Sequence, residues 1–159
     1  PLFVHEVELE GAAILRPQLA DLQTQCARWN ALYRCLETGL RDTAGLKLID
    51  RPATEGFVAS SFQFLLLDWP PASVQDVIAR CRARGVELKW FGGAEPSGFT
   101  SRYDSWRYAA SDRMPKSDRI LAGIIDMRLP LTFSTDDCTQ IARIIRAQVG
   151  AVWQNQAAE

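Results

Sequence analysis

Residues 57–91 read FVASSFQFLLLDWPPASVQDVIARCRARGVELKWF, and the order of elements in this stretch decides the fold. Polar and apolar side chains alternate over residues 57–67, which predicts a β-strand. One face of that strand carries Phe62, Phe64 and Leu66, and the other carries Ser61 and Gln63. A helix capped by Ser73 and ended by Gly85 follows, and residues 86–91 are predicted to form a second strand. The stretch therefore indicates a strand, a helix and a strand in succession.

Helical periods flank this stretch on both sides. Residues 9–40 are predicted to form one long helix, with Pro17 near its start and Gly39 as its stop. Its apolar stripe is Leu15, Leu19, Leu22, Cys26, Trp29, Tyr33 and Leu36. A final helix is expected after its cap at Ser134, with a frayed tail over residues 153–159. Its inner stripe is Cys138, Ile141, Ile145, Val149 and Val152.

The remaining segments complete an α/β (α+β) fold. Residues 116–123 are expected to form a short helix and residues 126–131 a short strand. We therefore expect a small sheet of about three strands, packed against the long N-terminal helix and the C-terminal helix. If the strands at 57–67 and 86–91 are parallel, the connection between them is expected to be right-handed. A length of 159 residues favours a single domain over residues 1–159.

Composition excludes several classes of function. The formal net charge of −1 gives no electrostatic argument for binding nucleic acid or an anionic membrane. The four cysteines form no CxxC pair, so no zinc site is expected and buried free thiols in a reducing, cytoplasmic compartment are predicted. His5 is the only histidine, which argues against Ser-His-Asp and Cys-His nucleophile arrangements. We predict no catalytic residue and no metal ligand in this chain.

Residues 92–115 form the longest stretch without a clear period. Long irregular loops in compact domains are often functional, and this one interleaves aromatic rings with arginines. Such a loop can bind a sugar, a nucleobase or a phosphate. The alternative is a structured loop whose rings fill the edge of the core. The sequence leaves both interpretations open.

Four strings, in this order, match a known family. They are GAAILRPQL at 11–19, SSFQF at 60–64, RGVEL at 84–88, and DMRLPL at 126–131 followed by STDD at 134–137. Together they resemble the C-terminal small domain of the DegT/DnrJ/StrS family. Members are pyridoxal-phosphate-dependent aminotransferases of the aspartate-aminotransferase fold, and most act on keto-sugars attached to nucleotides. The match covers nearly all of the chain.

The resemblance implies a division of labour with a large domain that this chain lacks. That domain would hold pyridoxal phosphate and its lysine, and would make the homodimer of the parent protein. This chain alone would then bind no cofactor and be inactive. In the parent it would help to close the pocket over a small-molecule substrate of the sugar or amino-sugar class. The alternative is a non-catalytic ligand-binding or assembly module from an inactive relative.

The resemblance also points to substrate-side residues. The loop after the second strand shapes the substrate site in the family, and here it corresponds to residues 90–103. The candidates for substrate contact are Lys89, Trp90, Phe91, Arg102 and Tyr103. This sequence has Trp90-Phe91 where many members have His-Tyr, so the substrate is expected to differ or the activity to be lost. A structural role is the alternative for each candidate.

Overall fold

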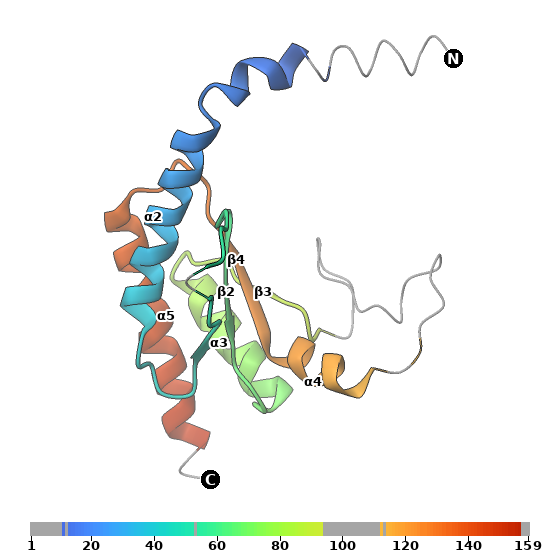
Figure 1. Cartoon of the computed structure of the whole chain (residues 1–159). Coiled ribbons are helices and arrows are strands. Elements are labelled where there is room, and N and C mark those ends of the chain that lie inside the picture. Colours follow the sequence, from blue (N-terminus) through green and yellow to red (C-terminus); the bar gives the residue numbers. More distant parts are fainter. Residues whose placement is uncertain (1–10, 12, 53, 94–111, 113, 157–159) are drawn as a thin grey trace.

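The computed structural model of the chain describes residues 11, 13–52, 54–93, 112 and 114–156 (Figure 1). The elements are α2 (Leu22–Leu40), β1 (Lys47–Leu48), β2 (Ser61–Leu65), α3 (Pro71–Ala83), β3 (Lys89–Trp90), α4 (Pro115–Gly123), β4 (Ile124–Arg128) and α5 (Thr135–Gln156). Within these residues four strands form one sheet in the order β1-β2-β4-β3, and every neighbouring pair is antiparallel. The α+β class expected from the sequence is confirmed.

β4 is the centre of the sheet. All five of its residues pair with β2, from Ser61 opposite Arg128 to Leu65 opposite Ile124. On its other edge Lys89 pairs with Asp126, and Trp90 with Ile125. β2 and β3 therefore run in the same direction but are separated by β4, so α3 connects two strands that are not neighbours.

Three expectations about the strands need correction. The sheet has four strands instead of about three, because residues 47–48 form a further strand that pairs with β2. β4 begins at Ile124 instead of Asp126, because α4 passes into it without a linker at Gly123. β2 and β3 are shorter than the apolar runs at 57–67 and 86–91, because antiparallel pairing covers only part of each run.

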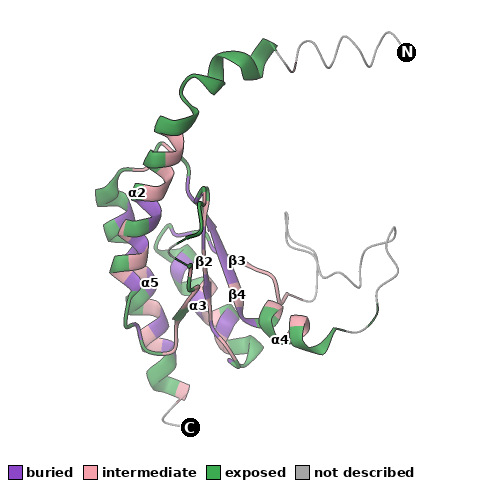
Figure 2. Ribbon diagram, viewed as in Figure 1, coloured by how far each residue is buried: buried purple, intermediate pink, exposed green. Residues whose placement is uncertain are grey.

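The core lies between one face of the sheet and the helices α2, α3 and α5. Figure 2 shows the buried residues on the facing sides of these helices and on the sheet. α2 packs along α5, and α5 also packs on α3. The largest fully buried side chains include Phe62, Phe64, Leu36, Ile125 and Ile145. Burial of each such side chain contributes about 1.5–3 kcal/mol to folding.

Gly39 sets the close approach of α2 and α5. A methyl group at this position would lie 2.6 Å from Cβ of Ala142, which is closer than carbon atoms pack. The sequence predicted Gly39 as the stop of the helix, but the helix continues through it to Leu40. The glycine is needed for the contact between helices, and no turn depends on it.

The long N-terminal helix is interrupted. Residues 13–19 are helical, a turn follows at residues 20–21, and α2 starts at Leu22. Pro17 lies inside the first helical segment, where the sequence predicted a helix start. The amino-terminal half of the predicted stripe stays exposed, with Leu15 59% and Leu19 64% accessible. Figure 1 shows why: this segment extends beyond the sheet and the other helices.

Local signals set the ends of α5 and α3. The cap predicted at Ser134 is confirmed as a reciprocal pair, because Ser134 Oγ accepts from the backbone N–H of Asp137 at 3.1 Å and Asp137 Oδ2 accepts from that of Ser134 at 2.8 Å. The Ser134 backbone N–H and the Ser134 hydroxyl, which donates to Asp137 Oδ2 at 2.7 Å, together lower the pKa of the Asp137 carboxyl. The cap predicted at Ser73 is wrong, since α3 begins two residues earlier at Pro71, whose missing N–H suits the first turn.

The tail predicted to fray from residue 153 is helical up to Gln156. Trp153 stacks on Trp69, with ring centroids 5.6 Å apart, and so fastens the end of α5 to the turn after β2. Gly45, at φ 78°, lies beneath both rings, and a methyl group there would come within 2.6 Å of Trp153 and 2.7 Å of Trp69. This arrangement requires a glycine.

We expect Gly45→Ala to lower the free energy of unfolding by about 2–5 kcal/mol, because a left-handed backbone and a steric overlap both oppose the methyl group. Gly85→Ala is the matched control. Gly85 has φ 82°, but nothing lies within 4 Å of an added methyl group, so only the backbone cost of about 1–2 kcal/mol remains. Urea unfolding of both variants checks the difference. Equal losses would mean that the two tryptophans do not confine residue 45.

Candidate functional site

The sheet has a polar face opposite the core. Because side chains alternate along a strand, the pairing places Ser61, Gln63, Lys89, Asp126 and Arg128 together on the face that the buried residues Phe62, Phe64 and Ile125 do not use. Gln63 Nε2 donates a hydrogen bond to Asp126 Oδ1 at 3.3 Å. Lys89 lies directly across from Asp126, and Arg128 is one diagonal step away. We call these five residues the outer polar face.

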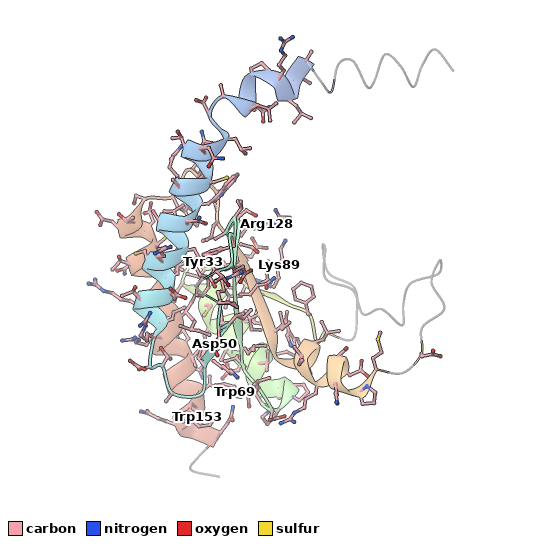
Figure 3. The ribbon with its side chains drawn as sticks, in the orientation of Figure 1. Tyr33, Asp50, Trp69, Lys89, Arg128 and Trp153 are labelled. Carbon is pink, nitrogen blue, oxygen red and sulfur yellow. The ribbon has the colours of Figure 1, made fainter. Side chains whose placement is uncertain are left out.

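Lys89 and Arg128 lie near each other at one end of this face. Figure 3 shows them on adjacent strands, both on the side of the sheet away from α2 and α5. Lys89 and Trp90 are consecutive in β3, so their side chains lie on opposite faces of the sheet. Two cationic side chains therefore lie on a diagonal beside the Asp126 carboxylate.

Trp90 and Phe91, the next two candidates, have structural contacts. Trp90 packs against the core cluster, and its Nε1–H donates to the carbonyl oxygen of Ala122 at 2.8 Å. A methyl group at Gly92 would lie 2.6 Å from Trp90 Nε1, so the chain turns tightly over this ring. The backbone N–H of Phe91 donates to the carbonyl of Ile124 at 3.2 Å. Trp90 therefore anchors the end of β3 to α4 and fixes where the next segment starts.

The other two candidates, Arg102 and Tyr103, lie outside the described residues, as does most of the loop predicted at 92–115. Among the candidates that the structure describes, Lys89 is the one whose side chain belongs to a polar surface. Sequence reasoning missed Arg128 as its neighbour. The signal was present as a cationic residue in the predicted strand at 126–131, but the register with Lys89 was needed to see it.

A pocket of about 380 Å³ opens beside Lys89 and Arg128. Its lining comes from the segment between α3 and β3, from β3 and β4, from the loop after β4 and from α5. It consists of Gly85, Val86, Glu87, Lys89, Met127, Arg128, Pro130, Phe133 and Ile141. The volume is at the small end of the range for ligand sites. The pocket thus joins a charged rim to an apolar floor.

The described residues give no nucleophile or metal centre. Cys81 and Cys138 are buried, and burial raises the pKa of each thiol from 9.0 to about 11, so both stay protonated at neutral pH. The prediction of buried free thiols is confirmed for Cys81 and Cys138, whereas Cys26 is only half-buried.

In the part of the chain that the structure describes, no three acidic, cysteine or histidine residues cluster as metal ligands. No helix in that part has the length and apolarity to cross a membrane.

The donor set for pyridoxal phosphate is not assembled in the described residues. Such a site needs a lysine, an acidic or basic partner for the pyridine nitrogen, and donors for the phosphate. The pocket contains one lysine, Lys89, and its one carboxylate, Glu87, is an exposed side chain two residues away on the same segment. No cofactor chemistry can be derived from this arrangement.

The architecture defines a class: a four-stranded antiparallel sheet that packs one face against the helices α2, α3 and α5. The sequence identifies the family. Residues 8–146 match the model of the DegT/DnrJ/EryC1/StrS aminotransferase family, and the chain belongs to that family. No curated protein matches the chain significantly.

Solved structures confirm the fold. The aminotransferase TlmJ from Streptoalloteichus hindustanus superposes with a TM-score of 0.71 at 18% identity, over 89% of this chain and 36% of that one. 3-Amino-5-hydroxybenzoic acid synthase gives 0.69 at 18% identity, over 88% and 38%. DesI, solved in the presence of its TDP-sugar product, gives 0.65 at 14%, over 88% and 35%. The chain therefore spans little more than a third of the length of these similar structures.

We expect Cys81 and Cys138 to resist iodoacetamide at pH 9.5 in the folded chain, because the reagent attacks thiolates and burial keeps both thiols protonated. From pH 9 to 11 the unfolded chain releases these protons while the folded chain holds them, so the free energy of unfolding should fall over that interval. Peptide mapping after timed alkylation, with a guanidinium-unfolded control, checks the first point. Labelling at the same rate in both states would contradict it.

Proposed function

We propose that this chain is the C-terminal small domain of a pyridoxal-phosphate-dependent aminotransferase-like protein, and that it helps to close a pocket over a keto-sugar or nucleotide-sugar. The observation that carries the proposal is the family match over residues 8–146 on a chain that spans about a third of similar aminotransferase structures. The cofactor, its lysine and the homodimer contacts would belong to a large domain outside this chain. Pyridoxal phosphate would supply the chemistry of amino transfer when bound there.

The fold supports a role in shaping the pocket. The helices cover one face of the sheet, which leaves the outer polar face to meet a ligand or another part of the protein. The hydrogen bond from Trp90 to Ala122 fixes the origin of the segment that follows β3. A rigid origin is what a substrate-contacting loop requires, because small displacements of contact groups cost catalytic rate.

Roles for the substrate-side residues follow from their chemistry. Arg102 would bind an anionic or hydroxyl group of the substrate and Tyr103 would stack on or hydrogen-bond to its ring. Lys89 would add a second cationic contact from the outer polar face. Trp90 and Phe91 would act by position, since the described contacts of both are with the protein itself. No residue of the chain is assigned a catalytic step.

We expect Arg102→Ala and Tyr103→Ala in the full-length protein to lower kcat/KM by about tenfold or more, because a hydrogen bond to a charged group contributes about 1.5–3 kcal/mol. Their melting temperatures should change little. Trp90→Phe is the matched control, because it removes the bond to Ala122 and should lower the melting temperature. Steady-state kinetics and thermal unfolding on the same preparations check this.

Parallel losses of activity and melting temperature in Arg102→Ala and Tyr103→Ala would assign both residues a structural role. A folded full-length protein with no activity toward keto-sugars and amino donors would overturn the enzymatic proposal. In that case the alternative of a non-catalytic ligand-binding or assembly module would replace it.

A further inference from the structure

α2 and α5 form a close, parallel pair of helices. Cys35 of α2 contacts Thr135 and Thr139 of α5. Gly39 lies one turn further along α2 and packs against Ala142, which is also further along α5. The contacts therefore advance in the same direction along both helices, which Figure 1 shows side by side. Because the helices meet so closely at Gly39, side chains one turn earlier are also held close together.

Cys35 inserts between four side chains of α5. Its thiol donates a hydrogen bond to the carbonyl oxygen of Thr135 at 3.2 Å, and its Sγ lies 3.3 Å from Thr139 Oγ1. Residues four positions apart on one helix form two corners of the hole that receives a side chain of the facing helix. The other two corners lie three and seven positions after the first, at Cys138 and Ala142. This packing places the Cys138 side chain beside Cys35.

Cys35 and Cys138 differ in their access to solvent. Cys35 is half-buried, whereas Cys138 is fully buried. Burial first, and then the charges of the neighbouring Cys35 and Asp137, raise the pKa of the Cys138 thiol to about 11. The electrostatic influence of Cys35 agrees with the placement of the two thiols in one packing layer. A reagent in solution therefore reaches Cys35 first, and Cys138 can react only with a group already held between the helices.

We propose that Cys35 and Cys138 form a reversible disulfide between α2 and α5 when the chain meets a small disulfide such as oxidised glutathione. The Cys35 thiolate attacks one sulfur of oxidised glutathione, which releases one glutathione thiolate and leaves a mixed disulfide on Cys35. The Cys138 thiolate then attacks Cys35 Sγ and releases the second glutathione. Two protein thiols are oxidised, one external disulfide is reduced, and the two thiol protons pass to the glutathione thiolates.

The cross-link joins the two helices whose packing closes much of the core. A disulfide between residues far apart in sequence stabilises a fold mainly by restricting the unfolded chain. The oxidised chain should therefore unfold at a higher urea concentration than the reduced chain, and a dithiol reductant should reverse the difference. This behaviour does not depend on the proposed transaminase role.

Incubation of the folded 159-residue chain with oxidised glutathione in mildly alkaline buffer tests the proposal. Free thiols are then blocked, and peptides are mapped without reduction. We expect one peptide that links Cys35 to Cys138 and an intact mass lower by two hydrogen atoms. The mixed disulfide should convert about tenfold faster per pH unit well below the pKa of Cys138, because attack requires its thiolate. Cys26→Ala, which removes the other half-buried thiol of α2, should leave the cross-link unchanged.

Two variants separate the steps of the reaction. Cys138→Ala should stop it at glutathione on Cys35. Cys35→Ser, which keeps a donor for the Thr135 carbonyl, should give neither a cross-link nor an adduct on Cys138.

Each of three results would overturn the proposal. They are a glutathione adduct that stays on Cys35 in the folded chain, no reaction of either thiol, and equal yields of the cross-link in the folded and the guanidinium-unfolded chain. Since the measurement needs neither cofactor nor turnover, it is independent of whether the full-length protein transaminates.

Discussion

The structure depends on β4, the strand that is hydrogen-bonded to β2 along one edge and to β3 along the other. It holds β2 through five pairs and β3 through two, and without it the two parallel strands would have no common partner. The chain passes directly from α4 into β4, and its strand pairing ends soon after β4. α4 runs into it at Gly123, where a methyl group would lie 2.8 Å from the backbone oxygen of Leu66, and Pro130 ends pairing beyond it. Ile125 and Met127 then point into the core, which orients the other side chains outward.

Because Ile125 and Met127 of β4 point into the core, the two faces of the sheet have different surroundings. The core face is covered by α2, α3 and α5, and α2 approaches α5 closely at Gly39. The outer face keeps polar groups, and its buried member, Asp126, is 8% exposed and bonded to Gln63. The charged residues Lys89 and Arg128 lie both on the outer polar face and in the lining of the pocket.

Much of the fold could be predicted because its signals are local. The alternation at Phe62 and Phe64, the stripe of α5 and the cap at Ser134 each depend on residues within a few positions of one another. Other features depend on partners far away in sequence. β1 has only two residues and is defined by its pairing with β2. The need for a glycine at position 39 follows from its contact with Ala142, which the sequence could not reveal.

The residues of the candidate site also fall into those that local sequence could place and those that only distant contacts could place. Lys89 could be placed on a polar face from alternation alone, but Arg128 joins it through a register between residues almost forty positions apart. Trp90 looked equally suited to substrate or core, and its indole N–H donates to the carbonyl oxygen of Ala122, which could not be known from the sequence. Leu15 and Leu19 recur at a clear helical period, but that period could not predict whether they would be buried. In the described fold both side chains are exposed.

The central proposal is that this chain helps to shape a substrate pocket in the full-length protein but does not itself hold the cofactor. The most direct test is to mix the folded 159-residue chain with one equivalent of pyridoxal phosphate, reduce with borohydride, and measure the intact mass and the modified peptide. We expect no stoichiometric adduct, because the lysine of the pocket lacks the acid and phosphate donors of a cofactor site. One cofactor fixed per chain at a single lysine would contradict the account.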